Sequence, residues 1–348
     1  MLTRAEWQAR KREIVERYAT PSNGRGSLQY LSVVAPLAAL WYVIATAPPG
    51  SIGILVAATA ALSLFLLRGF VLMHDCGHGS LFRSRSLNAL GGFLLGVLSG
   101  MPQQVWAENH RFHHSTNGNW AKYRGPLNVA CVSDYLAMDV RERRRYRYTR
   151  DILMSPLAGF LYFLVNPRLT WLRASWQLLR GRPLTYCASM THYRFMLWNN
   201  VVLLAAWGLM AWAVGPWRFL ACYVVSGSLA GAYGIVLFTV QHNFEHAYAS
   251  ADEGWCRDEA ALRGTSFLIL PGWLNWITAD AAYHHVHHLC ASVPNYRLKA
   301  CHREHERLFA SVTRVGLLEI PSALKHVLWD LPGRRLVSVA EVMGRAAG

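Results

Sequence analysis

The chain has 348 residues, of which 53% are hydrophobic and only 16% are charged. Soluble globular domains carry about 25% charged residues, so this composition points away from a soluble protein and toward a membrane protein. The net charge of +15 does not indicate nucleic-acid binding, because the basic residues lie outside long apolar runs and form no single soluble face. The seven cysteines are irregularly spaced without a C-x-x-C pair, and they therefore predict no disulfide framework.

Along the chain, four apolar segments reach or approach the roughly 20 residues that a helix needs to cross a bilayer. Tight turns at Pro48–Gly50 and Gly215–Pro216 would join these segments into two hairpins. The sequence therefore predicts an all-α fold with four transmembrane helices in one domain, residues 1–348. The predicted spans are Leu31–Ala47, Ile52–Met73, Trp198–Val214 and Phe219–Val240, and the remaining residues 74–197 and 241–348 would form a helical cytosolic cap.

Charges around these spans predict their orientation. Basic residues gather in the N-terminal arm and in the run Arg141–Arg150 between the hairpins, whereas the two turns carry almost no charge. Because positively charged flanks stay in the cytoplasm, both termini and the cap are expected there. The arm, residues 1–29, lacks the short apolar core of a cleaved signal peptide.

Two other apolar stretches, Leu87–Val105 and Ile152–Val165, are interrupted by Gly, Pro or polar residues. If both crossed the membrane, histidines that belong together would be split between its two sides. We therefore expect both stretches to lie in the interface or to dip into the bilayer. In the fourth span, Gly227 and Gly231 are four residues apart, which permits a close approach by a neighbouring helix.

Histidines form the most informative pattern in the chain. Eleven of the fifteen fall in four short clusters, two of which directly follow predicted spans. Residues three and four apart share one face of a helix, so the imidazoles within each cluster can converge. The clusters are His74-Asp-Cys-Gly-His78, His110-Arg-Phe-His113-His114, His242-Asn-Phe-Glu-His246 and His284-His285-Val-His287-His288.

The spacing also predicts which histidines stay outside a metal site. In the last cluster the three-and-four pattern selects His284, His287 and His288, so His285 is expected to point elsewhere and to act at most in a supporting position. The isolated His192 and His326 are expected to be ordinary packed or solvated side chains. His302 and His305 lie in a charged segment that favours a solvated helix.

The remaining histidines predict two metal ions with mostly imidazole ligands. Ten imidazoles exceed the four ligands of one structural zinc site, and the chain contains neither a His-Glu-x-x-His motif nor the Glu-x-x-His pairs of soluble di-iron bundles. Iron is the natural metal if the site activates O2. The predicted ligands are His74, His78, His110, His113, His114, His242, His246, His284, His287 and His288.

These boxes resemble those of the integral-membrane fatty acid desaturase family. The resemblance rests on H-D-C-G-H, on two H-x-x-H-H boxes, and on their order and position relative to the spans. It extends from about the second span to Leu298, through Val293-Pro-Asn-Tyr-Arg-Leu298. The three residues between His74 and His78 are typical of the bacterial and plant acyl-lipid branch, which would place the chain in a bacterial inner membrane as a multi-pass protein.

The resemblance implies a di-iron enzyme that uses O2 and electrons to introduce a double bond into an acyl chain. The substrate would be an acyl lipid or an acyl-carrier thioester. At the position of His242 the animal acyl-CoA branch has asparagine, which makes His246 the safer ligand and leaves His242 to bind directly or through water. The chain contains no G-x-G-x-x-G fingerprint and no cysteine set for an iron–sulfur cluster, so a separate ferredoxin-like or small haem protein with its reductase would supply electrons.

Several polar residues close to the boxes are candidates to orient the metal-bound imidazoles, with ordinary surface or capping roles equally open. They are Asp75, Glu108, Asn109, Glu245 and Asp280. The glycines of the fourth span are expected to serve helix packing rather than to line an acyl tunnel. The run Arg141–Arg150 is expected to face lipid head groups, with docking of an acidic electron donor or a phosphate-bearing head group as the alternative.

Two other functions remain open at this point. A related membrane di-iron enzyme could hydroxylate or ketolate a lipid, alkane or carotenoid with the same set of histidines. A metal transporter would need ligands near the middle of the membrane, but the predicted spans contain almost no His, Asp or Glu, which argues against transport.

Overall fold

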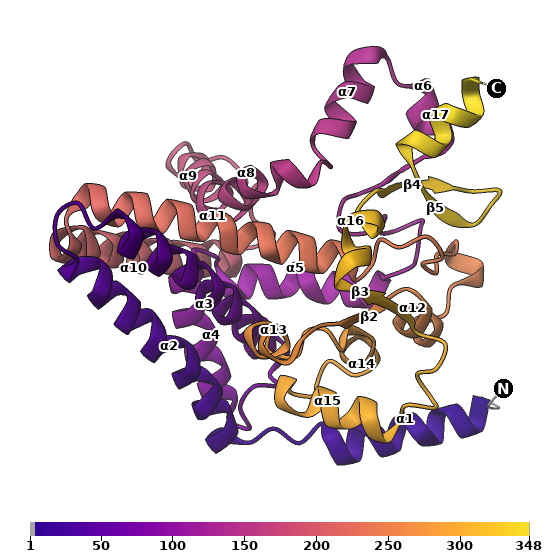
Figure 1. Cartoon of the computed structure of the whole chain (residues 1–348), viewed down its shortest axis with the longest axis horizontal. Helices are drawn as coiled ribbons and strands as arrows, with labels where there is room; N and C mark the ends of the chain where they lie inside the picture. The colour runs from indigo at the N-terminus through magenta and orange to yellow at the C-terminus, as the bar shows by residue number, and fades with distance from the viewer. Residues whose placement is uncertain (1–3, 348) are drawn as a thin grey trace.

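A computed structural model describes residues 4–347. The fold is mainly helical, and Figure 1 shows long helices gathered on one side and a cap of short helices and strands on the other. The four predicted spans correspond to helices α2, Asn23–Thr46; α3, Ile52–His78; α10, Met190–Val214; and α11, Pro216–Val240. Three of the four extend well beyond their predicted bounds, and α3 continues through the first histidine box.

Local sequence sets the ends of these long helices. Ser22 caps α2 by accepting a hydrogen bond from the N–H of Arg25, at 3.4 Å. Gly79 ends α3 with φ of +70°, a left-handed conformation that side chains with a Cβ avoid. Gly215, with φ of +93°, turns the chain between α10 and α11, and Pro216 opens α11. The two predicted hairpin turns therefore lie where the sequence places them.

A fifth apolar segment, residues 152–179, is also long and apolar enough to cross a membrane. It combines a 3₁₀ turn η1, Ile152–Met154; α8, Ser155–Gly159; a π-helical stretch η2, Phe160–Val165; and α9, Asn166–Leu179. The π-helical stretch lies just before Pro167. Proline has no N–H and its ring clashes with the carbonyl four residues earlier, which accounts for the widened helix at this point.

The fifth segment enters the helical bundle beside α11. A Cβ on Gly231 would lie 2.6 Å from Cα of Gly159, and one on Gly227 would lie 3.2 Å from the Leu164 side chain. The predicted close approach at these glycines is thus present. A single extra crossing would put His113 and His242 on opposite sides of the membrane, yet their rings are 4.7 Å apart. If the four long helices cross a membrane, the segment is therefore not a fifth crossing between these two histidines.

The other uncertain stretch, 87–105, is two helices. They are α4, Arg85–Ser99, and α5, Gln103–Thr116, separated at Gly100 with φ of +75°. Gly92 and Gly96 of α4 leave room for the Gln103 side chain. This packing sets α5, with the second histidine box, against the end of α3.

Short strands in the cap were not predicted. Strand β1, Ala130–Cys131, pairs parallel with β4, His326–Asp330, which pairs antiparallel with β5, Arg335–Ser338; β2, Ser266–Ile269, pairs parallel with β3, Thr313–Gly316. The cap helices are α6, Val132–Ala137; α7, Val140–Tyr148; α12, Arg257–Arg263; α13, Gly272–Ile277; α14, His284–Leu289; α15, Asn295–Glu304; α16, Ile320–Ala323; and α17, Val339–Ala347. Two 3₁₀ turns, η3, Asp252–Gly254, and η4, Leu317–Glu319, complete it.

The N-terminal helix α1, Arg4–Tyr18, supports the last histidine box from outside. Its Ile14 and Tyr18 are buried in one hydrophobic cluster with Val286 of α14 and Leu298 of α15. Tyr18 also donates a hydrogen bond to Glu304 at the end of α15. The arm that the sequence marks only by its charge therefore fixes α14 and α15 in place.

Candidate metal centre

Nine of the ten predicted ligands converge into two groups whose candidate ligand atoms lie within 4.8 Å of one another in each group. They come from four elements: the end of α3, α5, the turn after α11, and α14. The first group contains His74, His78, His110, His114 and His287, and the second contains His113, His242, His284 and His288. We call them the five-histidine group and the four-histidine group.

Two helices divide their histidines between the groups. On α5, His110 and His114 are one turn apart and join the five-histidine group, whereas His113 faces the other group. On α14, His287 joins the first group, and His284 and His288, again one turn apart, join the second. The H-x-x-H-H spacing therefore gives each helix one edge toward each group, because successive residues are rotated about 100° around a helix.

Pairs of ring nitrogens meet across these elements. His287 Nε2 lies 3.0 Å from His114 Nε2, and His284 Nε2 lies 2.9 Å from His242 Nε2. His113 Nε2 lies 3.2 Å from His288 Nε2. Such convergence of like groups is unfavourable for charged imidazoles and is typical of side chains that bind the same metal ion.

His246 is not brought to either group, and its prediction as the safer ligand is wrong in this structure. Its side chain is 76% exposed and lies 4.0 Å from Glu245. Helix α11 ends at Val240, and the following residues form turns. The four-residue spacing of His242 and His246 therefore does not place them on one helical face. His242 alone reaches the centre.

Burial favours the neutral form of the imidazoles in the four-histidine group. It lowers the pKa of His242 to about 4, partly opposed by the hydrogen bond between His242 Nδ1 and the Gly264 carbonyl, at 3.1 Å. Burial, and then the neighbouring histidines, also hold the pKa values of His113, His284 and His288 well below the usual 6.5. Neutral imidazole is the form that binds a metal ion.

One of the predicted supporting carboxylates contacts the centre. Asp75 Oδ1 lies 3.0 Å from His74 Nδ1, and its Oδ2 accepts a hydrogen bond from the N–H of Asn295, at 3.1 Å. Asp75 thus joins α3 to the start of α15 and fixes the orientation of the His74 ring. A carboxylate behind a ligating histidine is a common arrangement at metal sites.

The other candidates have different partners. Glu108 pairs with His192 and lies 3.8 Å from Arg111, and Glu245 pairs with Arg335. Asp280 lies in a turn with φ of +57°. Asn109 lines the cavity that adjoins the histidines.

His285 lies apart from both groups, in agreement with the spacing argument. It is fully buried, and its Nε2 lies 2.8 Å from His302 Nδ1. The prediction that His302 and His305 are solvated is wrong, because they are only 7% and 8% exposed. Helix α1 covers α15, which the charges around these histidines do not reveal.

The donor set fits two transition-metal ions. Ligands bound at about 2.1 Å from one ion are separated by up to about 4.2 Å, and each group gathers its candidate atoms within 4.8 Å. Within the two groups, the buried His78 Nε2 and His113 Nδ1 have no hydrogen-bond partner among the residues that the structure describes. Each ring has two nitrogens, and at His78 the unpartnered one is available to an ion.

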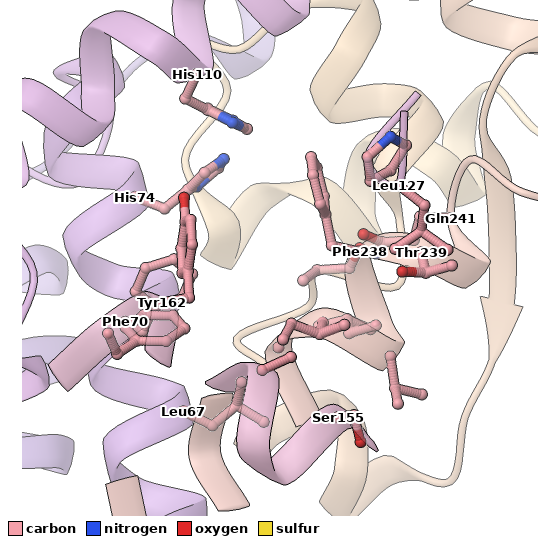
Figure 2. Close-up of a pocket in the computed structure, with 18 of the residues that line it drawn as sticks. Leu67, Phe70, His74, His110, Leu127, Ser155, Tyr162, Phe238, Thr239 and Gln241 are labelled. Atoms are coloured by element: carbon pink, nitrogen blue, oxygen red, sulfur yellow. Dashed lines mark hydrogen bonds between the residues drawn. The ribbon is translucent and has the colours of Figure 1, made fainter. Parts of the chain in front are cut away.

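A cavity of about 640 Å³ adjoins the histidines. Figure 2 shows His74 and His110 on one of its walls, Phe238 on the opposite wall, and Leu67 and Ser155 toward one end. Its lining is mainly apolar, and most of it comes from α3, α5, α11 and residues 149–166. The histidine centre therefore opens into a space suited to an apolar ligand.

Aromatic residues in this cavity wall were missed by the sequence argument. Trp106 stacks on His110 with ring centres 4.5 Å apart, and Tyr123 contacts the His113 ring edge-on at 5.0 Å. Tyr162 comes from the π-helical stretch and lines the same space. Trp106 lies one helical turn before His110, a signal that could have placed it on the histidine face; the positions of Tyr123 and Tyr162 depend on tertiary packing.

Comparison with known proteins agrees with this geometry. The profile of the family described as "Fatty acid desaturase" matches residues 49–315. A protein named "Fatty acid desaturase" from Bacillus subtilis (strain 168) is 33% identical over 326 residues, covering 93% of this chain and 88% of that protein.

More distant relatives cover less of their own length. The "Probable fatty acid desaturase DES1" of Sorghum bicolor is 30% identical, with 72% of this chain and 64% of that protein covered. The "sn-1 acyl-lipid omega-3 desaturase (ferredoxin)" of a Synechocystis strain is 25% identical, with 66% and 61% covered. The matched region includes all four histidine boxes, and we conclude that this chain belongs to the fatty acid desaturase family.

Proposed function

We propose that this protein is an O2-dependent di-iron desaturase that introduces a double bond into the acyl chain of a membrane lipid. The observation that carries the proposal is the convergence of nine imidazoles in two groups, five of which (His74, His110, His113, His284 and His287) line an apolar cavity. The alternative substrate form, an acyl-carrier thioester, would present the same methylene chain to the site.

Each group of histidines would hold one iron ion. The first ion would be bound by His74, His78, His110, His114 and His287, and the second would be bound by His113, His242, His284 and His288. Bound iron would supply the oxidising power, drawn from O2 and external electrons, that hydrogen removal from a methylene requires. Asp75 would hold the His74 ring in its binding orientation through the 3.0 Å contact.

The protein's own contribution is to position the acyl chain and to exclude water. Leu67, Phe70 and Phe238 form apolar walls beside His74 and His113. Phe70 is itself fixed by edge contacts with Trp106 and Phe163, at 5.2 and 4.9 Å. A chain held by such rigid aromatic walls has few orientations, and positioning of this kind can supply a large part of the rate enhancement.

Electrons would come from a separate protein and its reductase. The name of the Synechocystis relative specifies ferredoxin and an acyl lipid, which supports the same classes of donor and substrate here. A ferredoxin-like protein or a small haem protein fits this role. The exposed arginines of α7 form a basic surface. This surface could bind an acidic electron donor or the phosphates of lipid head groups.

We infer a multi-pass location in a bacterial inner membrane with both termini in the cytoplasm. The basic N-terminal arm and α7 flank the apolar helices on the side of the histidines, and the turns at Pro48–Gly50 and Gly215–Pro216 carry no charge. Under the positive-inside rule these turns face outward.

Expression in a host with compatible electron donors tests the reaction. Unsaturated fatty acids should rise in the membrane lipids only when O2 is present, and purified protein should need an added donor and reductase. His113→Ala should abolish the product, because it removes one nitrogen from the four-histidine group, whereas His246→Ala, at an exposed position, should retain it. If mass spectrometry finds only hydroxylated or keto products, the rival oxygenase function replaces this proposal.

A further inference from the structure

The segment between β2 and α14 exposes an unusual amount of apolar surface. No charged residue occurs between Arg263 and Asp280. Three large side chains around α13 face outward: Ile269 is 53% exposed, Trp273 62% and Trp276 47%. Neighbouring apolar side chains of this size are seldom left in water, so this surface calls for an occupant.

A buried cation fastens α13 to the membrane helices. Arg68, in the second half of α3, is only 1% exposed and donates hydrogen bonds to the carbonyl of Trp276 and to Gln29 of α2. Its guanidinium carbon lies 4.2 Å from the centre of the Trp276 ring. Phe65, almost one turn earlier on α3, meets the same ring edge-on at 6.1 Å. Helix α13 is thus held at the level of residues 65–68 of α3.

This level lies within the membrane if α3 crosses it. Helix α3 begins at Ile52 beside the outer turn, and Arg68 follows about 24 Å further along at 1.5 Å per residue. The hydrocarbon layer is about 30 Å thick. The outward surface of α2 at the same level is also apolar, since Leu28 and Leu31, which flank the Arg68 partner Gln29, are 69% and 57% exposed. The surface around α13 therefore continues the lipid-facing surface of the spans.

We propose that α13 is a re-entrant membrane contact of the cap, in which Ile269, Trp273 and Trp276 insert into the cytoplasmic leaflet and Arg68 anchors the inserted segment to α3. Lipid is the occupant that an uncharged surface with two tryptophans, continuous with membrane-spanning helices, fits best. The proposal rests on the proposed orientation of the spans and is independent of the reaction that the centre catalyses.

The contact has a consequence for the metal centre. Ala279 and Asp280 join α13 to α14 with φ of +48° and +57°, conformations that need support from their surroundings. The N–H of Asp280 donates to the Asn275 carbonyl at 2.8 Å, and Gln241 Nε2 donates to the Ala281 carbonyl at 2.7 Å. The inserted helix is therefore coupled through a tightly held turn to the three ligands on α14.

Fluorescence quenching in lipid nanodiscs tests the insertion. A cysteine replaces Trp273 in the full-length protein, with the exposed Cys256 changed to serine, and carries an environment-sensitive dye. Phospholipids brominated on the upper acyl chain should quench this dye as strongly as one at Val56, an exposed position of α3. A dye at Arg334, in the turn between β4 and β5, should instead be quenched by aqueous iodide.

Equal iodide quenching at residues 273 and 334 would overturn the proposal. Protection of the dye at residue 273 from both quenchers would also overturn it, because a protein surface, such as a second copy of this chain, would then cover α13. Neither outcome bears on the desaturase proposal, which is tested by products.

The anchor is tested separately with Arg68→Gln, which removes the charged fork. We expect the dye at residue 273 to lose more than half of its lipid quenching, while the dye at Val56 is unchanged. Undiminished quenching in a monodisperse Arg68→Gln protein would refute the role of Arg68. If that variant aggregates, Arg68→Lys, which keeps the charge but offers fewer donors, takes its place with the same criterion.

Discussion

The two histidine groups differ in how many side chains they offer and in what stands behind them. The five-histidine group draws on α3, α5 and α14 and has the Asp75 carboxylate behind His74. The four-histidine group draws on α5, the turn after α11 and α14, and a backbone carbonyl, that of Gly264, stands behind His242. One group thus has a spare imidazole and a charged support, and the other has neither.

This difference predicts unequal tolerance to the loss of one ligand. An ion in the five-histidine group would keep four imidazoles after one deletion, whereas an ion in the four-histidine group would keep three. Variants that retain the fold can therefore show whether the two groups are equivalent in metal binding.

The largest effect is expected for His284→Ala. Wild-type protein should bind about two irons per chain, and the variant should retain about one, because the four-histidine group falls to three nitrogens. His110→Ala, in the five-histidine group, should retain more iron than His284→Ala. Elemental analysis of purified protein gives both values.

The neighbouring His285→Ala is the matched control, because His285 is buried against His302 and contacts neither group. It should retain more iron than His284→Ala. Equal iron loss in His110→Ala and His284→Ala would show that the fifth histidine confers no tolerance, and the distinction between the groups would fail.

The sequence predicted the centre better than its surroundings. Repeated three-and-four spacing is a local property of a helix, so it selected the histidines of α5 and α14 that converge into the two groups and set His285 apart from them. The same spacing failed at His246, because helix α11 ends at Val240. Beyond that residue, a four-residue spacing no longer predicts that two side chains lie on the same face. Ligand choice there depends on a turn, which depends on packing against the cap.

The membrane region shows the same division. Apolar length predicted the four long helices, and small-residue spacing predicted the close contact at Gly231. The burial of His302 against Phe267 and Tyr283 could not be predicted, since it follows from contacts between segments far apart in the chain.

An intermediate effect is expected at the charged support of the five-histidine group. Asp75→Asn keeps the size of the side chain but removes the charge that faces His74 Nδ1, 3.0 Å away. Losses of about 10- to 100-fold in metal affinity are typical for such changes. Competition with an iron chelator should show weaker binding of one of the two irons. If both irons weaken equally, Asp75 supports the whole fold rather than one group.

The smallest effect concerns the four-histidine group without metal, and it appears as a pH dependence of stability. Burial lowers the pKa of His242 from 6.5 to about 4, so below pH 6.5 the unfolded chain takes up a proton that the folded chain refuses. The His242 pKa shift therefore leaves the free energy of unfolding unchanged above about pH 7 and lowers it as the pH falls from 6.5 toward 4. At pH 5.5 this one residue lowers the free energy of unfolding by about 1.4 kcal/mol. A glutamine at position 242 does not titrate and can still donate a hydrogen bond to the Gly264 carbonyl. Metal-free His242→Gln should therefore lose less stability than metal-free wild type between pH 7.5 and 5.5, as measured by thermal unfolding in detergent.

His246→Gln, altered at an exposed side chain, serves as the control and should follow the wild type. If the His242→Gln curve parallels the wild-type curve, the neutral buried imidazole does not limit the stability of the four-histidine group at low pH.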